Sequence, residues 1–226
     1  MSSADTNSNG EQTIEGVASK LGTKEHWDNC YDRELDVYDE TGDVGEIWFG
    51  ESCLRTMCKA IEKIASVTKD HRIVDLGCGN GYTLIELGQM GFTNLCGTDY
   101  SEKAIDLAKK IAEQEELDIE YLVDDIRNSK IEKDAFDVVL DKGTFDAMSL
   151  SEDKVQAKED YRSHILTILK PGGHFVITSC NYTEQEILAY FSNCGLEFSH
   201  HVKYPVFKFG GSTGSSQSTS VFIKSN

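Results

Sequence analysis

A glycine-rich turn joins a short apolar run to an amphipathic stretch, and its sequence is Asp75-Leu76-Gly77-Cys78-Gly79-Asn80-Gly81. Glycines let the backbone turn tightly and bring a ligand against the free amide groups that open the following helix. The spacing is GxGxG, which differs from the GxGxxG pattern of dinucleotide-binding proteins. Asp75 adds a carboxylate beside the turn, which favours a cationic ligand group over a pyrophosphate. We therefore expect Asp75, Gly77 and Gly79 to take part in binding a small ligand.

Three more carboxylates, Asp99, Asp125 and Asp141, follow apolar runs that have the length of buried strands. Asp99 lies twenty residues after the second glycine of the turn, as expected of an acid that accepts hydrogen bonds from ribose hydroxyls. Asp125 could accept a hydrogen bond from an adenine amine while the Ile126 amide meets a ring nitrogen. Because ligands bind at the carboxyl ends of parallel strands, these residues predict a nucleoside site at one edge of a sheet.

The elements that must position these residues alternate between strand and helix. Five apolar runs are expected to form strands, at 73–76, 94–98, 119–123, 136–140 and 174–178. Helical periodicity lies between them, at 82–90, 102–116 and 152–169. Ser101 and the Thr183–Glu186 pair are expected to cap the helices that follow them. The alternation predicts an α/β protein with a doubly wound, mostly parallel sheet.

The part of the chain after Gly195 has strand patterns only, at 196–209 and 219–224, joined by a Gly/Ser-rich loop. Two strands connected without a helix must be antiparallel. We therefore predict seven strands in all, closed by an antiparallel C-terminal hairpin.

The part before residue 67 lacks this alternation. Residues 1–24 are rich in Ser, Asn, Gly and Thr and are expected to form a disordered tail. Residues 25–66 contain two amphipathic helices, the first with Trp27, Tyr31, Leu35 and Tyr38 on one face. We expect this segment to form a helical cap or lid on a domain that spans residues 67–226.

The composition restricts the possible partners. The 226 residues include 22 Lys+Arg and 39 Asp+Glu, for a net charge of −17, and ten of the acids lie between Glu25 and Glu51. Such acidity disfavours a nucleic-acid partner, because phosphates are bound mainly by Lys and Arg. The acidic stretch is either a solubilising surface or a docking face for a basic partner.

Membrane and metal sites are not expected from the sequence. No apolar run approaches the ~18 residues of a membrane span, and the start lacks the pattern of a signal peptide. The seven cysteines form no CxxC pair, which indicates reduced thiols in a cytosolic-type compartment and argues against a zinc site.

The motifs together identify a resemblance. DLGCGNG, the strand end Gly97-Thr98-Asp99, Asp125 and LKPGG resemble class I S-adenosylmethionine-dependent methyltransferases. WDNCYDREL, GDVGEIWFGES, LDKGTFDA, SCNYTEQEI and FKFGGSTG resemble the elongation factor 1-alpha lysine methyltransferase 2 family, also called methyltransferase-like protein 10. This likeness extends from about His26 to Lys224. It implies a Rossmann-like fold and a cytoplasmic enzyme, with the nucleus as a second location, that methylates a lysine of the translation factor, a basic protein.

The resemblance also implies roles for individual residues at the methionine end of the cofactor. Trp27 and Tyr31 would close over S-adenosylmethionine, with Trp48 nearby. Gly77 would approach the methionine group, and Lys142 would lie beside it.

At the adenosine end, the resemblance implies that Asp99 and Tyr100 contact the ribose and adenine. Asp125 and Ile126 would contact the edge of the adenine.

Methyl transfer to lysine requires a neutral amine, because the protonated ammonium has no free electron pair. We therefore hypothesise that Asp141 orients the amine by hydrogen bonding. No NPPY or DPPY segment follows the fourth strand, which disfavours adenine or glutamine amide as the target. A small-molecule amine methyltransferase, a non-catalytic cofactor-binding adaptor and a nicotinamide-dependent oxidoreductase remain as alternatives. We expect the protein to be a monomer.

Overall fold

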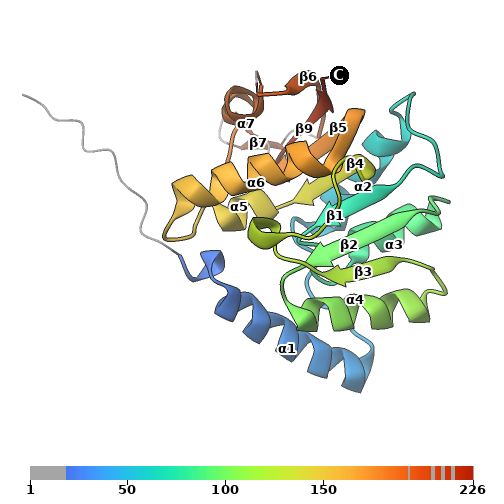
Figure 1. The fold of residues 1–226 in the computed structure, drawn as a ribbon. Coiled ribbons are helices and arrows are strands. Elements are labelled where there is room, and N and C mark those ends of the chain that lie inside the picture. Colours follow the sequence, from blue (N-terminus) through green and yellow to red (C-terminus); the bar gives the residue numbers. More distant parts are fainter. Residues whose placement is uncertain (1–18, 193, 205–206, 210–211, 215–216, 226) are drawn as a thin grey trace, which may run out of the picture.

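The structure is a computed structural model that describes residues 19–192, 194–204, 207–209, 212–214 and 217–225. A seven-stranded sheet forms its centre, in the order β3-β2-β1-β4-β5-β9-β6 (Figure 1). The strands are β1 Ile73–Leu76, β2 Leu95–Asp99, β3 Glu120–Val123, β4 Phe136–Lys142, β5 Leu169–Ser179, β6 Leu196–Val202 and β9 Ser218–Lys224. Strands β1 to β5 are parallel, and β9 is antiparallel to both of its neighbours. The predicted α/β sheet with an antiparallel C-terminal pair is confirmed.

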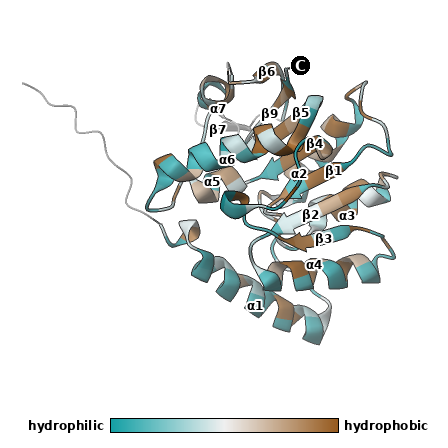
Figure 2. Cartoon of the chain, viewed as in Figure 1, coloured by the Kyte–Doolittle hydropathy of each residue, from teal (hydrophilic) through white to brown (hydrophobic). Residues whose placement is uncertain are grey.

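Helices cover both faces of the sheet because alternate strand residues point to opposite sides. Val138 and Leu140 belong to one apolar core, whereas Val139 belongs to the other. The first core includes residues of four helices: α1 Lys24–Thr41, α2 Gly50–Glu62, α3 Tyr82–Gln89 and α4 Glu102–Gln114. The second includes residues of three: α5 Thr144–Met148, α6 Lys154–Ile168 and α7 Glu184–Phe191. Figure 2 shows α1 mainly in hydrophilic colours, as expected for a helix on the outside.

The C-terminal strands differ from the sequence prediction in their limits. The stretch predicted as one strand, 196–209, is divided into β6 and a short β7, Phe207–Phe209, which pairs with β8, Ser212–Gly214, in a separate two-stranded sheet. Pro205 lies between these two pieces in the sequence and has no amide to donate to a strand ladder. The helix predicted at 152–169 is α6, which ends at Ile168, and strand β5 begins at the next residue, Leu169, so it starts earlier than the predicted strand at 174–178.

The predicted tail of residues 1–24 requires a correction at its end, because residues 19–24 are part of the folded structure. Residues 1–18 lie outside the described residues. A 3-10 helix, η1, spans Lys20–Gly22, and α1 begins at Lys24. The Ser19 amide donates to the Leu150 carbonyl at 3.1 Å. This contact links positions far apart in the sequence, so local composition gave no sign of it.

Helix α1 lies along α4 (Figure 1). The Tyr38 hydroxyl donates to Gln114 Oε1 at 2.7 Å, and Lys110 forms an ion pair with Asp39. These contacts attach the C-terminal end of α1, the helix that also carries Trp27 and Tyr31, to α4.

Candidate active site

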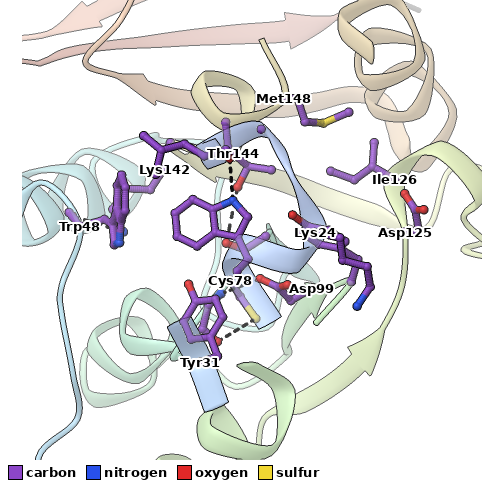
Figure 3. Close-up of a pocket in the computed structure, with 18 of the residues that line it drawn as sticks. Lys24, Tyr31, Trp48, Cys78, Asp99, Asp125, Ile126, Lys142, Thr144 and Met148 are labelled. Atoms are coloured by element: carbon purple, nitrogen blue, oxygen red, sulfur yellow. Dashed lines mark hydrogen bonds between the residues drawn. The ribbon is translucent and has the colours of Figure 1, made fainter. Parts of the chain in front are cut away.

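A cavity of about 310 Å³ lies at the carboxyl ends of the parallel strands and is lined in part by the first turns of α1. Figure 3 shows residues from several separate elements pointing into it. Ten of the twelve residues predicted from the sequence line it: Trp27, Tyr31, Trp48, Gly77, Gly79, Asp99, Tyr100, Asp125, Ile126 and Lys142. Asp75 and Asp141 do not. The strand ends have therefore brought most of the predicted residues to one place.

Asp99 is fixed at the centre of the site by the glycine turn. Its carboxylate accepts hydrogen bonds from the Gly79 amide at 3.1 Å and the Ser101 amide at 2.9 Å. Burial raises the pKa of Asp99 to about 6, and the two amide donors act in the opposite direction. Ser101 precedes α4, but its buried hydroxyl has no hydrogen-bond partner within the described residues, so the expected side-chain cap is wrong.

The glycine turn itself requires glycine. Gly77 and Gly79 have φ angles of +63° and +55°, a left-handed region that other residues rarely adopt. A Cβ at Gly77 would lie 2.2 Å from Thr144 Oγ1, and one at Gly79 would lie 2.3 Å from the Tyr31 hydroxyl. The bare backbone of the turn is thus enclosed by α5 on one side and α1 on the other.

One end of the cavity is formed by the residues after β3. The Asp125 carboxylate accepts a hydrogen bond from the Arg127 amide at 2.9 Å, which starts the short helix η2, Ile126–Asn128. Asp124 also lines the cavity, and its Oδ2 is buried without a hydrogen-bond partner among the described residues. An adenine with its exocyclic amine fits such an end, since it brings a donor to carboxylates and a flat apolar face to Ile126 and Met148.

Aromatic rings cover the middle of the cavity. The centroid of the Trp27 ring lies 5.0 Å from that of Trp48 and 6.1 Å from that of Tyr31. The Trp27 indole donates to the Leu21 carbonyl at 2.8 Å, so η1 and α1 hold each other over the site. The first part of the predicted lid therefore lies where a bound ligand would be covered.

Lys142 and Trp48 form the end of the cavity opposite Asp125 and Ile126 (Figure 3). Lys142 Nζ donates to the Trp48 carbonyl at 3.3 Å. Burial lowers the pKa of Lys142, and the nearby carboxyl of Asp75 acts in the opposite direction. A cationic or polar amine at this end suits the amino acid portion of a ligand whose adenosine occupies the other end.

Asp75 lies inside β1, where its side chain is only 2% exposed, rather than at the cavity wall. Burial raises its pKa to about 7. The groups that act on this carboxyl are Lys142, Thr83 and Asp99, and Asp75 does not line the cavity, so direct contact with a ligand is not part of this geometry.

Asp141 also lies away from the cavity, and its hydrogen bonds explain why. Its carboxylate accepts the Thr144 amide at 3.0 Å, the Phe145 amide at 2.8 Å and the Tyr161 hydroxyl. It is completely buried. The structure thus places Asp141 as the anchor of the turn between β4 and α5, which offers no support for direct orientation of an amine.

Several cavity residues were not predicted from the sequence: Leu21, Gly22, Lys24, Glu46, Cys78, Asn80, Asp124, Arg127, Gly143, Thr144, Ala147, Met148, Ser151 and Ala157. Most are near motif residues in the sequence. Their type alone gave no signal, except for Asn80, the polar residue within the glycine turn. Lys24 and Glu46 depend on how α1 and the segment after it lie over the sheet.

The described ranges contain no group of three or more His, Cys, Asp or Glu side chains placed to hold a metal ion. None of their helices combines the length and apolar character needed to cross a membrane.

Solved structures share this fold. The PH0226 protein from Pyrococcus horikoshii aligns with a TM-score of 0.64 at 16% identity, over 84% of this chain and 98% of its own. A TehB-like SAM-dependent methyltransferase from Corynebacterium glutamicum aligns with a TM-score of 0.59 at 21% identity, over 89% of this chain and 100% of its own. At these identities the likeness concerns the fold alone.

Sequence comparisons are closer. Residues 67–208 match a methyltransferase domain family. EEF1A lysine methyltransferase 2 of Danio rerio is 45% identical, over 90% of this chain and 88% of the relative, and the Homo sapiens protein of that name is 42% identical, over 92% and 88%. Protein-lysine N-methyltransferase EFM4 of Saccharomyces cerevisiae is 39% identical, over 95% and 99%. With a cavity suited to an adenosine at one end and an amino acid group at the other, this chain belongs to the EEF1A lysine methyltransferase 2 family of S-adenosylmethionine-dependent methyltransferases.

Proposed function

We propose that this protein transfers methyl groups from S-adenosylmethionine to a lysine of translation elongation factor 1-alpha. The observation that carries the proposal is the convergence on one cavity of ten residues that the sequence motifs and the family resemblance predicted for the site. The choice of substrate is supported by relatives that are named for this factor and match at least 90% of this chain.

The adenosine portion would be held by the residues after β2 and β3. Asp99 offers a carboxylate to the ribose hydroxyls, and its own position is fixed by two amide donors. Tyr100 would lie beside the ribose and adenine. Asp125 and the Ile126 amide would meet the adenine edge, since both line that end of the cavity.

The methionine portion would lie along the glycine turn. Gly77 and Gly79 present bare backbone there, and Lys142 lies at the far end. Trp27, Tyr31 and Trp48 would cover the ligand. In this proposal Asp75 supports the turn from inside β1.

S-adenosylmethionine supplies, when bound, an electrophilic methyl group on a sulfonium. The target lysine has a reference pKa of ~10.4, so its deprotonation near pH 7 costs roughly 5 kcal/mol. The aromatic cover formed by Trp27 and Trp48 would exclude water from the occupied cavity, and desolvation lowers the pKa of an amine. In this proposal the site promotes methyl transfer by positioning the reactants and by desolvation, and no strong base is required.

The test is direct methylation of purified elongation factor 1-alpha by the purified protein with isotope-labelled S-adenosylmethionine. Mass spectrometry of the factor should find label on one lysine, and Asp99→Asn should reduce it at least tenfold. A matched reaction without the factor measures background. Label found only on small amines would assign the protein to small-molecule methylation. Cofactor binding without transfer to the factor or to any protein or amine of a cell extract would make it a cofactor-binding adaptor.

We further propose that the protein acts as a monomer in the cytoplasm, where its substrate takes part in translation. Size-exclusion chromatography with light scattering tests the first point, and cell fractionation tests the second. A dimer mass, or recovery from the nuclear fraction alone, would contradict these expectations.

A further inference from the structure

The segment between α1 and α2, residues 42–49, forms part of the cavity wall and is called the strap here. It has no helix or strand of its own. Two of its side chains, Glu46 and Trp48, line the cavity. Because ordering an irregular segment costs about 1 kcal/mol or more per residue in backbone entropy, the strap needs contacts that hold it in place.

Asn80 of the glycine turn supplies two of those contacts. Its side chain is only 8% exposed, and Nδ2 donates to the carbonyl oxygens of Val44 at 2.9 Å and Glu46 at 3.3 Å. Its Oδ1 accepts the Tyr82 amide at 3.2 Å, at the start of α3. The Asn80 amide group therefore joins the cofactor turn to the strap, and both of its bonds to the strap flank Gly45.

The other end of the strap is held by the residues after β4. Lys142 donates to the Trp48 carbonyl at 3.3 Å. Phe49 adopts a left-handed φ of +65°, and a Cβ at Gly143 would lie 3.0 Å from its ring. The strap is thus attached at both ends to the two loops that border the methionine end of the cavity.

Glu46 and Trp48 have the chemistry to receive a lysine. The Glu46 side chain is exposed at the cavity and forms no ion pair within the described residues, so its carboxylate is free to attract an ammonium. Trp48 is partly buried, and an indole ring binds alkyl chains and cations on its face.

We propose that Asn80 is a positioning residue for the protein substrate, which acts by holding the strap so that Glu46 and Trp48 receive the target lysine. This inference rests on the proposed function. Asn80 lies in the motif that binds the cofactor. Its side-chain amide nevertheless donates to the strap, which in this proposal contacts the protein substrate.

The first test is Asn80→Asp, which keeps an acceptor for the Tyr82 amide but turns the donor toward the strap into an acceptor. The kcat/KM for elongation factor 1-alpha should fall about 30-fold, the equivalent of two lost hydrogen bonds. Binding of S-adenosylhomocysteine, measured by calorimetry, should change less than about threefold. The matched control is Asn94→Asp, because Asn94 Nδ2 also donates to a carbonyl, that of Asp70 at 3.4 Å, on an exposed surface. It should keep kcat/KM within about twofold.

The second test separates positioning from a general structural role. In a Trp48→Ala background, Asn80→Asp should reduce kcat/KM by less than about threefold further, since the residue acts through the strap. If the two substitutions reduce kcat/KM by factors that simply multiply, Asn80 acts independently of Trp48, and the positioning role is wrong. Glu46→Gln, on an exposed side chain, should raise the KM for the factor about fivefold, and its effect on the affinity for S-adenosylhomocysteine should be clearly smaller.

The outcomes distinguish this inference from the proposed function. If the wild-type protein methylates the factor and Asn80→Asp does so equally well, only the positioning role is overturned. A cofactor affinity reduced tenfold or more in Asn80→Asp would assign Asn80 to the cofactor site instead. If the wild-type protein methylates no lysine of the factor, the proposed function itself fails.

Discussion

At the scale of single residues, Asp99 is the group whose charge should govern cofactor binding. It is buried, its pKa is about 6, and its carboxylate faces the cavity. Ribose hydroxyls donate hydrogen bonds to the ionised carboxylate, and protonation removes that acceptor. Because binding favours the ionised form, affinity should be constant well above pH 6 and should weaken as the pH falls through that value.

The measurement is calorimetric titration with S-adenosylhomocysteine from about pH 8 to about pH 5. We expect affinity to fall by up to tenfold per pH unit below about 6. Asp99→Asn should bind weakly throughout and lose this dependence on pH. Equal affinities for the wild-type protein at both ends of the range would show that the charge of Asp99 does not matter.

Asp75 and Asp141 are two buried carboxylates whose positions could not be predicted from residue type and strand position alone. Asp75, Asp99, Asp125 and Asp141 share the same position at or near a strand end, so the sequence predicts that all four meet a ligand. Two of them do line the cavity. The Asp141 carboxylate is instead saturated by two amides of its own turn and by Tyr161, twenty residues away, a tertiary contact that no local pattern reveals.

At the scale of elements, the glycine turn and α1 fit against each other, and a single methyl group tests that fit. Gly79→Ala places a Cβ 2.3 Å from the Tyr31 hydroxyl, so the Tyr31 ring, alone or together with α1, must move away from the turn. Cofactor affinity should fall more than tenfold, since the cover over the methionine end is displaced. Calorimetry with S-adenosylhomocysteine measures this.

Gly91→Ala is the matched control for this substitution. Gly91 also has a left-handed φ, +91°, but no atom lies within 4 Å of a Cβ built there. Both variants should lose about 1 kcal/mol of stability from backbone strain alone, and Gly91→Ala should bind the cofactor within about twofold of wild type. If both variants lose similar cofactor affinity, the loss comes from the strained backbone and not from the contact with Tyr31.

The elements with complete local patterns were the ones predicted well. Strands β1 to β4 and helices α3 and α4 each have an apolar run or a helical face of their own, and the structure confirms their positions within a few residues. The capping box at Thr183 is also confirmed. The strap could not be predicted, because its shape comes from Asn80 and Lys142 on other elements. The division between β6 and β7 likewise depends on pairing partners rather than on apolar pattern.

At the scale of the whole molecule, the net charge is −17, but acids that already form ion pairs are less able to attract a basic partner. On α1, Asp32 pairs with Lys103 and Asp39 pairs with Lys110, so these two hold the helix to α4. Asp36 and Glu40 are exposed and form no ion pair within the described part of the chain. With Glu25, they are the exposed acids of this helix that have no ion pair within the described residues, and so they are suited to attract a basic substrate.

The double reversal Asp36→Lys/Glu40→Lys should therefore raise the KM for elongation factor 1-alpha about three- to tenfold at low salt. The effect should shrink as salt increases, because screening weakens attraction between exposed charges. Cofactor affinity should not change. Asp118→Lys/Glu132→Lys is the control: it alters the net charge equally, near the amino ends of β3 and β4, and should leave KM unchanged. If both pairs of substitutions change KM equally, the acids of α1 serve as a solubilising surface and do not attract the substrate.

The position of β9 has a consequence for how the chain is made. This strand lies between β5 and β6, and Lys224 at its end donates to the carbonyl oxygens of Leu166 and Leu169. During synthesis, β5 and β6 leave the ribosome before the strand that separates them. Until residues 218–224 emerge, the edge of β5 is unpaired and open to other chains. A nascent chain can therefore assemble the five parallel strands that carry the cofactor site while the edge of β5 still needs protection from aggregation.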